Sequence, residues 1–149
     1  MSVALLSAQR SKDPSTQVGA CIVSPSKRVV GVGYNGFPNK CPDDQLPWGK
    51  DSEDENETKY PYCVHAELNA ILNTTQMGLK NCTIYVTLFP CSDCTKAIIQ
   101  SGITHVIYLN EIIKPRYLHS MEASKRMLDL ASIPYSKFEK TGRYICLEL

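Results

Sequence analysis

Two short segments of the sequence combine residue types that bind a soft or borderline metal ion. One is His65-Ala66-Glu67, and the other is Pro90-Cys91-Ser92-Asp93-Cys94. One imidazole and two thiolates suit zinc and leave the fourth position of its tetrahedron open for water, as a catalytic site requires. We therefore predict one zinc ion per chain, bound by His65, Cys91 and Cys94.

Glu67 stands two residues after His65, where a carboxylate can face a metal-bound water without binding the metal. Zinc lowers the pKa of bound water to about 7, and a neighbouring carboxylate can take up the proton and return it to a ring nitrogen and a leaving amine. Attack on an amino-bearing ring carbon with loss of ammonia is hydrolytic deamination. Glu67 is the predicted proton shuttle of that reaction.

Each segment opens a predicted helix. Cys91 and Cys94 lie three residues apart in a first turn, so both sulfurs share one face, and the positive helix end favours their thiolate forms. The alternative is a closed structural site with Cys63 as fourth ligand. Cys63 lies only two residues before His65, on another side of the extended entry, so we favour the open site. A second, structural zinc at Cys41 or Cys63 is a further alternative, which we do not favour.

The elements that must hold these segments follow from the hydrophobic pattern. Residues 17–23 and 28–34 are β-branched runs separated by a turn, which predicts a β-hairpin. Residues 35–62 contain four prolines and no periodicity, which predicts a long surface loop. The remaining pattern predicts helices over 64–73, 91–100 and 118–131, strands over 83–88 and 104–109, and weaker strands over 135–138 and 144–147. Alternating strands and helices predict a partly parallel sheet covered on both faces.

Length, composition and charge exclude several classes of protein. The chain has 149 residues and 43% hydrophobic residues, which fits one domain over 1–149. It has no apolar run long enough for a membrane span, and seven cysteines cannot all pair. We expect a soluble protein of the cytoplasm, with the nucleus as the alternative. Residues 43–57 carry seven acids and one lysine, so the remainder has a formal charge of +7. This suits a small anion such as a nucleotide rather than a polynucleotide.

The histidine-x-glutamate and proline-cysteine-x-x-cysteine pair is a signature of zinc deaminases. Beyond this pair, the chain resembles deoxycytidylate (dCMP) deaminases over nearly its whole length. The resembling segments are residues 8–14, 17–20, 33–36, 59–62, 65–71 and 89–91.

This resemblance implies an α/β, cytidine-deaminase-like three-layer fold, with a five-stranded mixed sheet and helices on both faces. It implies conversion of dCMP to dUMP and ammonia, which feeds thymidylate synthesis. It also implies a homo-oligomer, commonly a hexamer, activated by dCTP and inhibited by dTTP with magnesium. The effector is expected near Tyr34, Asn35 and Gly36.

Several residues are predicted to bind the substrate. Arg10 and Lys12 could neutralise the 5′-phosphate, since a guanidinium fork matches phosphate oxygens. The resemblance places Asn35 in contact with the sugar or nucleotide, although Asn-Gly is first of all a turn signal. Ala66 is included from the first motif. Tyr117 could stack on the pyrimidine, with core packing as its alternative.

Two features depart from the family. Nine residues precede Arg10, so the first helix is expected to be cropped, and residues 111–120 lack the expected acidic, serine-containing pattern. The alternative functions are deamination of another free base or nucleoside, deamination of tRNA adenosine, and a catalytically silent zinc-binding scaffold. The scaffold would be marked by loss of Glu67, which is present.

Overall fold

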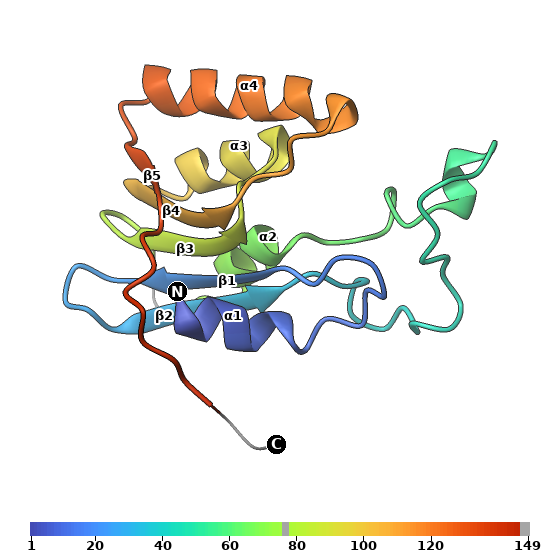
Figure 1. Cartoon of the computed structure of the whole chain (residues 1–149), viewed down its shortest axis with the longest axis horizontal. Coiled ribbons are helices and arrows are strands. Elements are labelled where there is room, and N and C mark those ends of the chain that lie inside the picture. The colour runs from blue at the N-terminus through green and yellow to red at the C-terminus, as the bar shows by residue number, and fades with distance from the viewer. Residues whose placement is uncertain (76–77, 147–149) are drawn as a thin grey trace.

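A five-stranded mixed sheet organises the computed structural model of the chain, which describes residues 1–75 and 78–146 (Figure 1). The strand order is β2-β1-β3-β4-β5. β1 pairs antiparallel with both β2 and β3, whereas β3, β4 and β5 are parallel. The strands are β1 (Gly19–Val23), β2 (Val29–Tyr34), β3 (Thr83–Leu88), β4 (His105–Asn110) and β5 (Tyr135–Lys137). The predicted hairpin and mixed sheet are therefore confirmed.

Helices cover both faces of this sheet. They are α1 (Ser2–Ala8), α2 (Ala66–Leu72), α3 (Ser92–Gln100) and α4 (Pro115–Leu130). α1 packs on β1 and β2 from one side, α2 packs on the same strands from the other, and α3 lies between α2 and α4 (Figure 1). The predicted three-layer α/β class is confirmed. In the described residues, no helix is both long and apolar enough to span a bilayer.

Glycines let the helices approach the hairpin closely. A Cβ atom on Gly33 would lie 2.2 Å from the Ala66 carbonyl oxygen, and one on Gly19 would lie 1.9 Å from the Ala4 carbonyl oxygen. Both separations are far below van der Waals contact, so neither position accepts a side chain without displacing a helix. Gly33 thereby fixes the first turn of α2, which carries Glu67.

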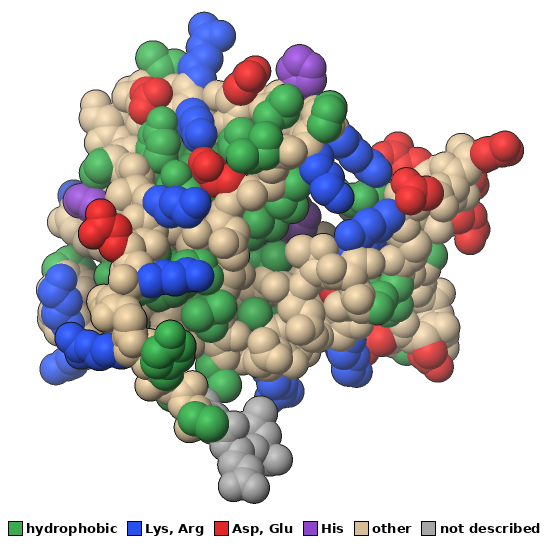
Figure 2. All heavy atoms as spheres, viewed as in Figure 1, with side chains coloured by type: hydrophobic (Ala, Val, Ile, Leu, Met, Phe, Trp, Pro, Cys, Tyr) green, Lys and Arg blue, Asp and Glu red, His purple; other side chains and the backbone are tan. Residues whose placement is uncertain are grey.

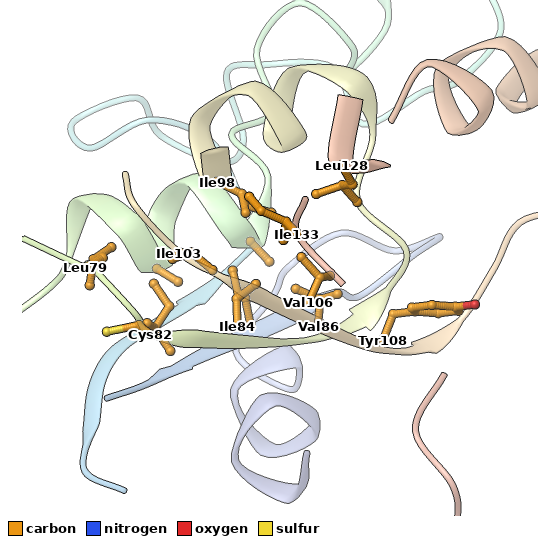
Figure 3. Packing of buried hydrophobic residues seen from close by; sticks show 14 of the residues in the cluster. Leu79, Cys82, Ile84, Val86, Ile98, Ile103, Val106, Tyr108, Leu128 and Ile133 are labelled. Carbon is orange, nitrogen blue, oxygen red and sulfur yellow. The ribbon is translucent and has the colours of Figure 1, made fainter. Parts of the chain in front are cut away.

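The hydrophobic core lies on the α2 and α3 side of the central strands (Figure 3). Ile84 and Val86 of β3 and Val106 of β4 point toward Ile98 of α3, and all four are at most 1% exposed. Leu128 joins α4 to the same cluster. Because β3 and α3 are consecutive, this core fixes the β3–α3 junction, where Cys91 lies.

The C-terminal part differs from the sequence-based expectation. Residues 144–146 form no strand, and Leu147, the end of that predicted strand, lies outside the described residues. The side chain of Tyr144 is 96% exposed and that of Ile145 is 68% exposed, so neither packs on a sheet edge. The prediction of a strand here was wrong because β-branched and aromatic residues alone do not supply a partner strand.

The long loop over residues 35–62 is present. It contains one short 3-10 helix, η1 (Glu55–Glu57), and its ends are joined by a bridge between Gly36 and Val64. In Figure 1 the loop projects beyond the end of the sheet at which α2 begins.

Candidate active site

Three metal-binding side chains converge at the starts of two helices. His65 is the N-cap of α2 and Cys91 is the N-cap of α3, and both have extended backbone conformations. Cys94 lies in the first turn of α3. The Nδ1 atom of His65 is 3.4 Å from the Sγ atoms of both Cys91 and Cys94, and the three donor atoms lie within 4.8 Å of one another.

These distances fit a zinc ion. Zn–S and Zn–N bonds at a tetrahedral angle place a sulfur and a nitrogen about 3.6 Å apart. The observed spacings of 3.4 Å are close to this value. The donors are one imidazole and two thiols, which suit zinc, and His65 is exposed toward the adjoining pocket. The cluster in the described residues has three donors, so solvent or substrate would supply the fourth ligand of a tetrahedral ion.

The three donors perturb one another's ionisation. The hydrogen bond to Cys91 raises the pKa of His65 to about 9. The thiol of Cys94 lowers the pKa of Cys91 to about 4, together with the hydrogen bond from His65 and against the effect of burial. The bond to Cys91 and burial together raise the pKa of Cys94. Cys91 is therefore the thiol that ionises first, and its thiolate lies beside the imidazole.

Glu67 lies beside this cluster, in the first turn of α2. Its side chain lines the same pocket, and the residue is only 4% exposed. Burial raises the pKa of its carboxyl, which makes protonation easier than in water. Ala66 is fully buried and also lines the pocket. The structure thus brings Glu67 and Ala66 to the three metal-binding side chains.

The pocket has a volume of about 190 Å³. His65, Glu67 and Cys91 form one end, and Leu88, Phe89, Ile112, Tyr117 and Met121 supply its apolar walls. Figure 2 shows a hollow with a histidine side chain inside it, and basic side chains gather along its rim. Apolar walls beside a metal-binding end suit an aromatic ring such as a pyrimidine.

A buried polar network forms another part of the pocket lining. Asp13 accepts hydrogen bonds from the ammonium of Lys59, from the side-chain amide of Asn35, and from two backbone amides. The side chains of Lys59 and Asp13 are 8% and 0% exposed. Asn35 also donates to the Thr16 carbonyl and accepts from the Val18 amide. Both hydrogens of the Asn35 side-chain amide are therefore used by the protein itself.

Two further contacts bring the long loop to the pocket. Lys50 lines it and donates to the Thr16 hydroxyl at 3.2 Å. Tyr60 lies with its hydroxyl 3.3 Å from that of Tyr117 at the start of α4, while the guanidinium of Arg116 lies 4.1 Å from the Tyr60 ring centroid. The loop and α4 thus meet at the mouth of the pocket.

Arg10 and Lys12, which were predicted to bind the phosphate, lie outside the pocket lining. Lys12 forms an exposed ion pair with Asp43, and Arg10 lies 5.9 Å from the ring centroid of Tyr34. Neither is among the residues that line the pocket. Tyr34 and Gly36 also lie outside the lining, so of the predicted effector segment only Asn35 reaches the pocket.

Sequence reasoning missed Asp13, Lys50, Lys59 and Ser120. Asp13 and Lys59 lie in two of the family-like segments, and their opposite charges were a usable signal. Lys50 is the lone base of the acidic stretch, a pattern that could have marked it. Ser120 carried no signal, because its contact with Ser92 joins helices that are distant in sequence.

The sequence of this chain is similar to those of known proteins. Residues 1–110 match the family described as the cytidine and deoxycytidylate deaminase zinc-binding region. The deoxycytidylate deaminase of Mus musculus is 52% identical over 140 residues, which cover 93% of this chain and 76% of that protein. The human deoxycytidylate deaminase is 51% identical over the same shares.

A solved structure shows the same fold. The dCMP deaminase of cyanophage S-TIM5, in complex with dCMP and dUMP, superposes with a TM-score of 0.69. It is 25% identical to this chain, and the match covers 92% of each. Together with the sequence match over most of the chain and the His-Cys-Cys cluster beside a buried glutamate, this shows that the chain belongs to the cytidine and deoxycytidylate deaminase family and has its zinc-binding region.

Proposed function

We propose that this chain hydrolyses dCMP to dUMP and ammonia, with one zinc ion held by His65, Cys91 and Cys94. One observation carries the proposal: a single pocket joins the three-donor cluster and a buried carboxylate to a lysine at its rim. The similarity to deoxycytidylate deaminases over 93% of the chain supports the choice of substrate.

The residues of the chain have separate tasks in this reaction. Zinc would supply Lewis-acid activation of water. Glu67 accepts one proton of the attacking water at its carboxylate and passes it to the ring nitrogen beside the reacting carbon. It then takes up the second proton of that water and delivers it to the amino group, which leaves as ammonia. Its burial limits its contact with bulk water. Phe89 and Tyr117 hold the ring between apolar walls, so the amino-bearing carbon faces the metal end.

The charges of the pocket favour a nucleotide over a nucleoside. The ammonium of Lys59 is neutralised by Asp13, and both side chains are buried. Lys50 has no such carboxylate partner in the contacts of the described residues and donates only to a neutral hydroxyl. We propose that Lys50 binds the 5′-phosphate, and that Arg116, which lies over the ring of Tyr60 at the mouth of the pocket, adds positive charge nearby. Arg10 and Lys12 are the earlier sequence-based candidates for this role.

Substrate preference tests the proposed function directly. The zinc-loaded chain is incubated separately with dCMP, deoxycytidine, dCTP and cytosine, and the released ammonia is measured. The highest kcat/KM is expected for dCMP, because it is the only one of the four compounds with a monophosphate that Lys50 can bind. Comparable rates for deoxycytidine would refute nucleotide specificity, and no release from any of the four would refute the proposed reaction.

The oligomeric state, the control by effectors and the location in the cell are proposals that rest on the family resemblance. We propose a homo-oligomer, with the hexamer as the expected form, because α1 leaves Val3, Leu5 and Leu6 between 43% and 46% exposed. Light scattering after size exclusion would measure the mass. We also propose control by dCTP and by dTTP with magnesium, and a cytoplasmic location with the nucleus as alternative. Effector titrations and fluorescent tagging would test these.

A further inference from the structure

The helix that carries two of the three metal-binding side chains has an unusual start. Ser, Thr, Asp and Asn usually occupy the N-cap, because their oxygens accept hydrogen bonds from the free amides of the first turn. In α3 the N-cap is Cys91, which forms no side-chain capping bond. The position that normally restrains a helix start is thus given to a metal-binding sulfur.

A side chain from another helix contacts this first turn. The backbone amide of Ser92, the first residue of α3, donates to the Oγ atom of Ser120 in α4 at 2.9 Å. The Ser120 hydroxyl in turn donates to the Ser92 Oγ atom at 3.1 Å. One hydroxyl therefore bonds twice to the residue that directly follows Cys91.

The helix that carries Ser120 is held in place. Within this helix, the buried hydroxyl of Ser124, one turn later, donates to the Ser120 backbone carbonyl at 2.9 Å, a bond that does not involve the Ser120 hydroxyl. α4 is further tied to the fold by the ion pair of Lys125 with Glu111 and by burial of Leu128 in the core. A contact made from such an anchored helix restrains the start of α3, because Ser120 does not follow the movements of α3.

We propose that Ser120 is a positioning residue of the metal centre, which fixes the first turn of α3 so that the sulfurs of Cys91 and Cys94 face His65. The inference rests on the proposed zinc site. It follows from the general behaviour of metal centres, in which groups that orient the ligands contribute to affinity without binding the metal. Loss of this hydroxyl frees the Ser92 amide and lets the first turn shift.

Zinc release is the measurement that separates this role from a merely structural one. Zinc-loaded full-length protein is mixed with excess chelator, and release is followed with a metal-sensitive dye. Loss of such an orienting group typically costs about 10- to 100-fold in metal affinity or activity. Ser120→Ala is expected to release zinc at least about tenfold faster than the parent. Ser120→Thr keeps the hydroxyl and is expected to release it at nearly the parent rate.

Ser124→Ala is the matched control, since it removes a buried serine hydroxyl from the same helix, and the hydrogen bond of that hydroxyl stays within α4. It is expected to keep the parent release rate. The absorption spectrum of the cobalt-substituted protein gives a second readout, in which Ser120→Ala should alter the thiolate bands and Ser124→Ala should not. Parent-like release and spectrum in Ser120→Ala would overturn the proposal, as would a raised KM with unchanged zinc binding, which would mark a substrate contact instead.

Two further variants keep the result decisive. Should Ser120→Ala fail to fold, as judged by circular dichroism, Ser92→Ala removes the hydroxyl partner and is expected to speed zinc release severalfold. A parent rate in Ser92→Ala would then contradict the proposal. Cys91→Ser and Cys94→Ser test the zinc site separately, and full zinc content in both would refute that site rather than the role of Ser120.

Discussion

Glu67 combines burial with a position beside the metal-binding side chains. Replacement by Gln keeps the shape and a hydrogen-bonding group but cannot carry a proton. We expect Glu67→Gln to retain zinc and to lose at least about a hundredfold in kcat, which corresponds to about 3 kcal/mol of transition-state stabilisation. Steady-state kinetics and metal analysis of the same sample measure both. Activity within threefold of the parent would assign the proton shuttle to another group.

Asp13 stabilises the loop wall through a buried ion pair. Burial opposes ionisation of its carboxyl, but the Lys59 ammonium and the amides of Ser15 and Thr16 outweigh it, so the pKa of Asp13 lies below its ordinary value. Asp13→Asn leaves the ammonium of Lys59 buried without a counter-charge. The expected loss is about 3 kcal/mol in the free energy of unfolding at pH 7, measured by urea titration.

The pH dependence of this loss has a defined sign. A carboxyl whose pKa is lower in the folded state contributes stability above its unfolded pKa of about 3.9, and this contribution disappears as the pH falls through the folded value. The gap between the parent and Asp13→Asn should therefore narrow below about pH 4. Asp43→Asn, which breaks only the exposed pair with Lys12, should leave the free energy of unfolding nearly unchanged. A gap that is constant with pH would contradict the role of the Asp13 charge.

The long loop brings its one lysine between residues 43 and 57 to the pocket. The proposed contact of Lys50 with the 5′-phosphate would give the loop a part in substrate choice. We expect Lys50→Ala to raise the KM for dCMP about tenfold and to leave the slower reaction with deoxycytidine unchanged, because a charge-assisted hydrogen bond contributes about 1.5 kcal/mol or more. Arg10→Ala is the comparison variant, since Arg10 does not line the pocket. A raised KM in Arg10→Ala alone would support the sequence-based assignment and refute ours.

The elements around the metal centre could be predicted from the sequence because local rules fix them. The strand Thr83–Leu88 was predicted at its observed bounds, and the helix at Cys91 began one residue late, with Cys91 as its cap. The convergence of His65 with Cys91 and Cys94 followed from motif spacing. The wall of the pocket that the long loop supplies could not be predicted, because the loop has no periodicity and its course depends on contacts such as that of Asp13 with Lys59. Likewise, Ser120 meets Ser92 only through the packing of α4 on α3.

The whole molecule separates its charges in space. The stretch over residues 43–57 has a formal charge of −6, and the rest of the chain has +7. Figure 2 shows acidic side chains gathered on the projecting loop and basic side chains beside the hollow. A doubly charged phosphate is therefore attracted to the rim, and the projecting acids discourage binding of a long polyanion across the loop.

Such long-range attraction has a measurable dependence on salt. The Debye length falls from about 30 Å at 0.01 M to about 8 Å at 0.15 M ionic strength, so salt weakens the pull of exposed charges on dCMP. We expect the KM for dCMP to rise severalfold over this range, while the KM for uncharged deoxycytidine stays flat. The triple variant Glu53→Gln, Asp54→Asn, Glu55→Gln removes repulsion and should lower the KM for dCMP at low salt only. If dCMP and deoxycytidine responded equally to salt, the dependence would reflect the stability of the fold, and the charge separation would have no part in substrate capture.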